Sequence, residues 1–252
     1  MIIGGSVPAV PSCILDPIRD QFLALLPTHE DRHPWGCHNP RISDAVVFDR
    51  ETLRLLVLAA YDRMIGLELD QLSADGCITE APSGGECAGK SPVDRAKRGL
   101  KRSQLTDGRG IPLVTDPAPA NTRDHTLLPA TLDRFADLEA VLGPLPEHPS
   151  LSLDAGYDYS MVHLDLKARG IFGQIAERGA KTSIQAGGRW VVECTNSWMN
   201  NFGKLRRCTE RRRAPVEFFI ALASTIITVR CLLRRAWTLY RWGTRPRNPR
   251  IR

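Results

Sequence analysis

Three extended runs in close succession limit the choice of fold more than any other feature of this sequence. Residues 65–79 alternate apolar and polar side chains, as a strand with one buried face does. Two shorter apolar runs follow at 100–105 and 111–115, and the Asp107-Gly108 pair between them is typical of a tight β-hairpin. We therefore expect three neighbouring antiparallel strands.

Helical and extended patterns alternate through the chain after these strands. Apolar residues at helical spacing predict helices over 127–142 and 159–168, and short apolar runs predict strands at 151–154 and 171–175. A further helix is expected over 189–207. This is a mixed α/β order, and alternating connections of this kind favour parallel strands at one edge of the sheet.

The N-terminal part predicts short helices and two loops that resemble functional motifs only in part. Helices are expected over 14–26 and 52–65. Residues 29–41 hold three histidines and a cysteine, but two prolines and the lack of a second ligand pair argue against a zinc site. The glycine-rich run 81–90 lacks the GKS/T ending of a phosphate-binding loop.

The charge of the chain is unevenly distributed. The net charge is +6, yet 14 Lys and Arg residues stand against two acidic residues from Lys204 onward, so the preceding part is acidic overall. A basic, arginine-rich C-terminal quarter suggests a polyanionic partner, with a solubilising tail as the alternative. Seven cysteines without a CxxC pair, and no secretory leader, indicate a reduced cytosolic chain.

One apolar run could be mistaken for a membrane span. Residues 218–229 carry no charge, but twelve residues fall short of the ~20 that a bilayer requires, and Glu217 and Arg230 flank them. We therefore expect a buried helix over 216–233 that packs the helix over 189–207 against the sheet. The tail beyond it mixes arginines with aromatic residues, as DNA-binding segments do, although Trp237 could equally complete the core.

The most strongly patterned helix covers residues 189–207. Its apolar stripe recurs at helical spacing and consists of Val191, Thr195, Trp198, Phe202 and Leu205. A second stripe on the same period is polar and consists of Glu193, Asn196, Asn200, Lys204 and Arg207. Asparagine lowers helix propensity, and a stripe that served only solubility would be rich in Glu and Lys. The polar stripe therefore either faces a partner or is the solvated face of a core helix.

Three carboxylates fall where α/β sheets collect their chemistry, at strand ends and on the helix packed across them. Asp75 lies within the first extended run, Asp154 ends a later strand, and Glu193 lies near the start of the patterned helix. Taken singly, each aspartate could equally be a turn former or a surface charge. On one face of a sheet the three would repel one another unless cations lay between them, and Mg²⁺ suits such hard oxygen ligands.

Four segments together resemble insertion-sequence transposases of the DDE superfamily, and the resemblance runs from about residue 13 to the C-terminus. They are Leu72–Gly76, Thr106–Leu113, Leu153–Asp158, and Arg189–Glu193 with the Trp198–Phe202 and Leu205–Arg207 stretches that follow it. The resemblance implies an α/β fold, an RNase H-like mixed sheet flanked by helices after a short helical N-terminal segment. It also implies a catalytic triad of Asp75, Asp154 and Glu193 that holds two Mg²⁺ ions, with Mn²⁺ as a substitute.

The resemblance also implies an activity and binding partners. The family cuts transposon ends with metal-activated water and joins the freed 3′-hydroxyl to target DNA. The implied partner is double-stranded DNA, both terminal inverted repeats and target, without a membrane, and a homodimer is one form that the complex could take. The implied location is the bacterial cytoplasm, at the nucleoid when bound to DNA. The expected DNA contacts are Arg189, Asn196, Asn200, Lys204, Arg206, Arg207, Lys101 and Arg102.

The same resemblance divides the chain into three parts. Residues 1–64 form a truncated helical segment of the DNA-binding type, 65–233 the RNase H-like catalytic domain, and 234–252 a basic tail. Relatives carry a longer DNA-binding segment between the positions of Arg50 and Glu51, so we interpret the direct junction here as an internal deletion.

Some positions depart from the family pattern and leave two readings open. Relatives commonly have a tyrosine at the position of Ala186 and a basic residue at the position of Asn200. At the position of Cys194 they commonly have arginine or another polar residue. The chain is then either a transposase with an intact metal site or a catalytically inactive remnant that only binds DNA. A weaker alternative is an RNase H-like nuclease that acts on other nucleic acid.

Overall fold

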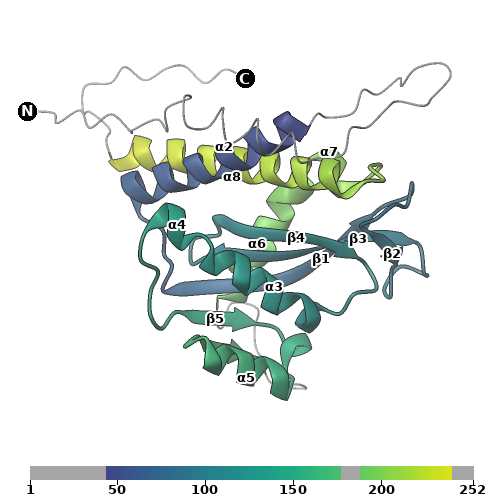
Figure 1. Ribbon diagram of the computed structural model, residues 1–252, viewed down its shortest axis with the longest axis horizontal. Coiled ribbons are helices and arrows are strands. Elements are labelled where there is room, and N and C mark those ends of the chain that lie inside the picture. Colours follow the sequence, from purple (N-terminus) through teal and green to yellow (C-terminus); the bar gives the residue numbers. More distant parts are fainter. Residues whose placement is uncertain (1–43, 177–187, 240–252) are drawn as a thin grey trace, which may run out of the picture.

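The computed structural model describes residues 44–176 and 188–239, with side chains from residue 51 onward (Figure 1). The helix expected over 14–26 and the run 29–41 lie outside the described residues, as does the basic tail from residue 240.

A single mixed sheet forms the centre of the molecule. Its strands run in the order β2-β3-β1-β5-β6, and β4 also pairs with β3. The β1, β3 and β4 strands are antiparallel neighbours, whereas β1, β5 and β6 are parallel. The predicted mixed α/β sheet, its three antiparallel strands and its parallel edge are therefore confirmed. The strands are β1 (Gln71–Glu80), β2 (Ala88–Lys90), β3 (Arg98–Asp107), β4 (Pro112–Pro119), β5 (Ser150–Leu153) and β6 (Phe172–Ile175).

Helices cover both faces of the sheet and one of its edges. Helices α2 and α8 lie side by side along the β4 edge, α3 lies on one face, and α6 lies behind the sheet in Figure 1. The helices are α2 (Asp44–Ile65), α3 (Asp124–Ala136), α4 (Glu139–Leu142), α5 (Ser160–Ala168), α6 (Arg189–Asn200), α7 (Gly203–Arg206) and α8 (Arg213–Leu239), with a 3₁₀ turn η1 (Ala155–Tyr157) after β5.

Several element boundaries differ from those that the patterns predict. The first strand starts at Gln71, because the preceding residues close the end of α2: Gly66 has a φ of 85°, and Asp62 accepts a hydrogen bond from the Leu67 amide. The glycine-rich run holds the short strand β2. The expected helix over 127–142 is divided into α3 and α4, and α8 extends beyond both predicted ends.

The helix expected over 189–207 also breaks in two. Helix α6 ends at Asn200, Phe202 adopts an extended backbone with a ψ of 114°, and α7 begins at Gly203. Asn200, Asn201 and Gly203 have low helix propensity, which accounts for the break at this point.

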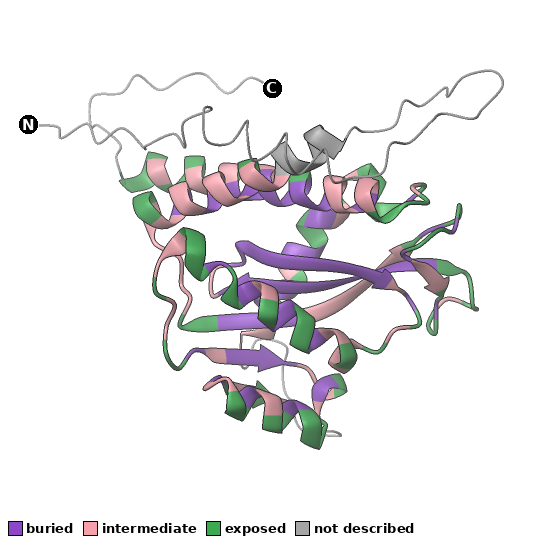
Figure 2. Cartoon of the chain, in the orientation of Figure 1, coloured by how far each residue is buried: buried purple, intermediate pink, exposed green. Residues whose placement is uncertain are grey.

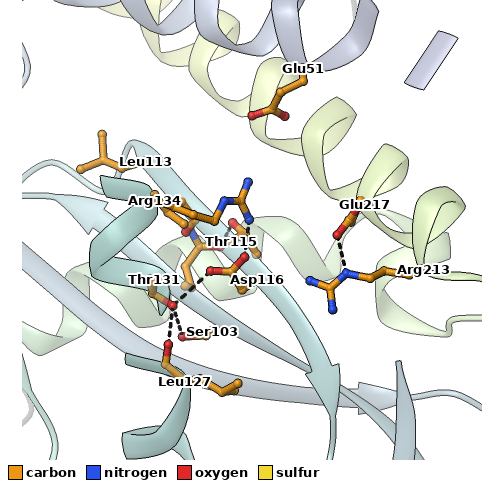
Figure 3. Close-up of polar contacts among 12 residues, drawn as sticks. Glu51, Ser103, Leu113, Thr115, Asp116, Leu127, Thr131, Arg134, Arg213 and Glu217 are labelled. Carbon is orange, nitrogen blue, oxygen red and sulfur yellow. Dashed lines mark hydrogen bonds and ion pairs between the residues drawn. The ribbon is translucent and has the colours of Figure 1, made fainter. Parts of the chain in front are cut away.

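Side chains of the central strands show that α3 and α6 lie on opposite faces. The Ser103 and Thr131 hydroxyls are 2.9 Å apart, which ties β3 to α3 (Figure 3). Thr131 also donates to Asp116 on β4, and the same carboxylate binds Arg134. Ser73, in contrast, donates to the carbonyl that precedes α6. Ser73 pairs with Thr106 on β3, so these two side chains lie on the same face of the sheet. Ser103 precedes Thr106 by three positions on β3, and side chains three positions apart on a strand point to opposite faces. Ser73 and Ser103 therefore lie on opposite faces.

Two apolar clusters lie between these layers, and Figure 2 shows that much of the sheet is buried. The larger one joins α2, α3 and α5 to the sheet and includes Leu58, Leu105 and Leu151. The smaller one joins α6, α7 and α8 to the other end of β3 around Leu100 and Met199. Helix α8 is long and apolar enough to cross a membrane by length and composition, but it contributes Val216, Ala223 and Ile227 to the smaller cluster. The expectation that residues 216–233 form a core helix agrees with this packing.

Candidate active site

Parallel pairing of β1 with β5 brings two of the three predicted carboxylates together. Ser73 on β1 pairs with Ser152 on β5. Asp75 lies two residues beyond Ser73, and Asp154 lies two residues beyond Ser152. The two aspartates are therefore level with each other along neighbouring parallel strands, which lie about 5 Å apart. Asp154 directly follows β5 and accepts a hydrogen bond of 2.8 Å from the Gly156 amide, which begins the 3₁₀ turn.

Helix α6 carries the third carboxylate, and two hydroxyl groups fix the helix to the sheet. Ser73 Oγ donates to the Gly188 carbonyl over 3.1 Å, at the residue before α6. Thr195 Oγ1 donates to the Gly110 carbonyl over 2.7 Å, in the β3–β4 turn. Both glycines have positive φ angles, 74° and 81°, which other residues rarely adopt. Glu193 lies between these two attachments and is exposed.

The electrostatics of Asp75 connect the three carboxylates. The pKa of Asp75 is raised to about 7, chiefly by burial and also by the negative charges of Asp154, Asp124 and Glu193, although a hydrogen bond from the Gly76 amide lowers it. The other two predicted site residues therefore oppose the ionisation of Asp75. This is the situation that a bound cation relieves.

Two further residues belong to this region, and the sequence patterns missed both. Tyr157 is 1% exposed, its hydroxyl has no hydrogen-bond partner among the described residues, and burial together with the charge of Asp75 raises its pKa well above the usual value. Asp124 begins α3, and its carboxylate would contact any side chain at Gly76. The only sequence signal was proximity: Tyr157 follows Asp154 by three residues, whereas nothing local connects Asp124 to Asp75.

The chemical type of the three side chains fits a divalent metal, although the side chains are not already arranged around a metal position. Within residues 44–176 and 188–239, no three His, Cys, Asp or Glu side chains are already arranged around a metal position. Asp75, Asp154 and Glu193 nevertheless supply the hard oxygen ligands that Mg²⁺ and Mn²⁺ prefer, from the middle of β1, the end of β5 and helix α6. An exposed Glu193 on the second turn of α6 has the freedom to turn toward the other two.

The residues expected to bind DNA fall into two groups. Lys204, Arg206 and Arg207 are exposed around α7, although Lys204 already pairs with Glu210 at 2.5 Å. Arg189 is half-buried at the start of α6, and Ala186 lies outside the described residues.

Of the other four expected contacts, three are buried and Asn200 is half-buried. Lys101 is 4% exposed and pairs with Asp124 at 2.8 Å, and Asn196 is 6% exposed. Arg102 is fully buried and donates to Asn200 Oδ1 over 2.5 Å. Direct DNA contact at Lys101, Arg102 and Asn196 does not agree with this burial, and the polar stripe of the helix is solvent-facing only in part. The cause is that α3 and α6 cover both faces of β3.

The sequence of this chain is similar to those of known transposases. Residues 71–228 match the family model described as the transposase DDE domain. The chain is 34% identical over 148 residues, 58% of its length, to an inferred transposase for insertion sequence element IS402 of Burkholderia cepacia, of which it covers 70%. A Mos1 transposase paired-end complex with the left transposon end matches over 88% of this chain and 72% of that one, with 10% identity and a TM-score of 0.34. A simian T-cell lymphotropic virus intasome matches over 74% and 59%, with 12% identity and a TM-score of 0.37.

Proposed function

This chain belongs to the family of transposases with a DDE domain, and we propose that it cuts DNA at transposon ends and joins the freed 3′-hydroxyl to target DNA. The observation that carries the proposal is that Asp75 within β1 and Asp154 directly after β5 lie at the same level of two parallel strands, and that the charges of Asp154 and Glu193 raise the pKa of Asp75. A carboxyl group whose pKa is strongly raised by burial and by neighbouring charges is typical of a catalytic site.

The three carboxylates would hold the metal ions, Mg²⁺ or Mn²⁺. When bound, such ions activate water and stabilise the attacking and leaving oxygens of a phosphodiester. The contribution of the protein is to hold the metal-binding side chains in position. Attachment of α6 through Ser73 and Thr195 fixes the backbone of Glu193 relative to the two strands, and the buried Tyr157 hydroxyl is available to donate a hydrogen bond to a carboxylate of the site.

The Glu193→Gln variant tests the proposal directly. It keeps the shape of the side chain but removes the negative charge that a divalent metal requires. We expect the wild-type protein to nick DNA that carries the inverted repeats flanking its own coding region, in Mg²⁺ or Mn²⁺ and not in a chelator. In Glu193→Gln the rate should fall at least about 100-fold, in line with the loss of a charge-stabilising group.

Cys194→Ala is the matched control, because it changes the neighbouring residue without changing charge. Equal nicking by wild type and Glu193→Gln would remove Glu193 from the mechanism. DNA binding that weakens with salt but never leads to metal-dependent cleavage would instead support the inactive DNA-binding remnant.

A further inference from the structure

A groove with a volume of about 660 Å³ lies at the C-terminal end of β1, between the β2–β3 loop and helix α7. Basic side chains come from both of its walls and outnumber the acidic ones. The basic residues are Lys97, Arg98, Arg206 and Arg207, and the acidic residues are Glu80 and Asp94. The groove therefore carries an excess of positive charge.

The basic groups of this groove are only loosely engaged within the protein. Arg207 Nε lies 3.7 Å from a Glu80 oxygen, and Lys97 Nζ lies 3.5 Å from an Asp94 oxygen, with all four side chains exposed. Exposed pairs of this kind contribute about 0 to 1 kcal/mol, so a phosphate can replace the carboxylate at little cost. Arg206 is exposed and pairs with no carboxylate among the described residues.

The loop that carries the basic residues of one wall is strained. Arg95 and Ala96 have φ angles of 45° and 59°, a conformation that costs non-glycine residues about 1–3 kcal/mol each. Internal hydrogen bonds hold the turn: the Lys97 amide donates to the Asp94 carbonyl, and the Asp94 amide donates to Ser91 Oγ. Strain that is held in place by the surrounding structure is typical of functional segments, and here it directs Lys97 toward the groove.

The free edge of β1 connects this groove with the candidate active site. On the edge opposite β3, the β5 strand pairs with β1 only as far as Ser73. Among the residues that the structure describes, the next backbone contact on that edge is at Glu80, whose carbonyl accepts from the Cys208 amide over 2.7 Å and which bridges to Arg207. Residues 74–79 of β1 therefore have no backbone partner on this edge among the described residues. Asp75 lies near the start of this stretch, and the groove lies at its end.

We propose that this groove binds the DNA backbone a few nucleotides from the phosphate that is cut. Thr79 in the groove wall follows Asp75 by four strand residues, which span about 13 Å, and one DNA strand carries a phosphate about every 3.4 Å along the helix axis. The inference rests on the proposed DNA substrate. It assigns a strand-positioning role to Lys97 and Arg98, which lie outside the four segments that carry the family resemblance, together with Arg206 and Arg207.

Salt-dependent DNA binding tests the groove without requiring cleavage. The full-length protein is titrated onto a fluorescein-labelled duplex of mixed sequence at several salt concentrations, in a chelator. The variant Lys97→Ala/Arg206→Ala removes one charge from each wall. We expect the slope of log affinity against log salt to decrease by about 2, because each lost phosphate contact contributes about 0.9.

Lys167→Ala/Arg63→Ala is the matched control, with the same residue types lost from exposed positions on α5 and α2. It should keep the wild-type slope. Lys97→Glu alone, on an exposed loop, reverses one charge of the groove and should weaken binding further than Lys97→Ala alone. A groove variant with the wild-type slope overturns the proposal even if the enzyme cuts DNA. A reduced slope in the groove variant supports it even if no cleavage is found.

Discussion

Asp75 combines burial, neighbouring negative charge and a central place in the sheet, so its protonation affects folding as well as chemistry. A carboxyl group whose pKa is higher in the folded protein than in the unfolded chain binds its proton more tightly when folded. Its contribution to stability is complete below the unfolded pKa of about 3.9 and is lost as the pH rises through about 7. In metal-free protein, ionised Asp75 therefore destabilises the fold at neutral pH.

Asp75→Asn should remove this dependence. We expect the variant to have a free energy of unfolding roughly 2–4 kcal/mol higher than the wild type at pH 8, and little advantage at pH 4. Denaturant unfolding at both pH values, in a chelator, measures the difference. Asp70→Asn, at an exposed position just before β1, should behave as the wild type at both. Parallel pH curves for Asp75→Asn and the wild type would contradict the assigned cause.

Thr195 is the residue on which the position of α6 most directly depends. Thr195→Val keeps the shape of the side chain but leaves the buried Gly110 carbonyl without its donor, which costs about 1–3 kcal/mol. We expect lower stability by thermal unfolding and slower cleavage, because Glu193 lies half a turn away on the same helix. Thr195→Ser retains the hydroxyl and should recover most of both losses; equal damage in the two variants would assign the effect to packing.

At the scale of elements, local signals predicted the order of the strands well. The Asp107-Gly108 hairpin, the alternation before it and the short strand that ends at Asp154 each depend on neighbouring residues, and the structure contains all three. Asp75, Asp154 and Glu193 were named from those elements and from the family resemblance. Their electrostatic coupling agrees with that choice, while metal binding at the three residues stays a prediction.

Burial of the polar residues on β3 could not be predicted locally. Lys101 and Arg102 are adjacent in the sequence and point to opposite faces, where α3 covers one and α6 covers the other. An alternating or polar run is typical of a strand with one solvent face, yet β3 is buried along almost its whole length. Which helix covers which face depends on contacts between residues that are far apart in the chain.

For the molecule as a whole, α2 belongs to the same packed unit as the sheet. It runs without interruption from Asp44 to Ile65, through the Arg50–Glu51 junction, and lies along α8. Arg54 donates to the Leu113 carbonyl on β4 over 2.8 Å, and Leu58 enters the larger core. Unfolding of α2 should therefore expose the core rather than release a separate segment.

Two leucines on α2 test this. Leu58 is 1% exposed, so Leu58→Ala should lower the free energy of unfolding by about 2–5 kcal/mol within a single cooperative transition. Leu53 is 49% exposed, and Leu53→Ala on the same helix should cost less than about 1 kcal/mol. Far- and near-ultraviolet circular dichroism should follow one curve for each variant. A separate early transition in Leu58→Ala would show that α2 unfolds independently.

The attachment of α6 has a consequence for how this protein changes over evolutionary time. Both hydroxyls that hold the helix bond to backbone carbonyls, which every amino acid retains, and both acceptors are glycines with positive φ. These two attachments are thus encoded by four positions, Ser73, Thr195, Gly110 and Gly188, while the end of the helix is held by the Arg102–Asn200 hydrogen bond. Substitutions can accumulate at other positions of the helix, as the departure at Cys194 illustrates, while the carboxylate of Glu193 continues to be presented on the same side of the sheet.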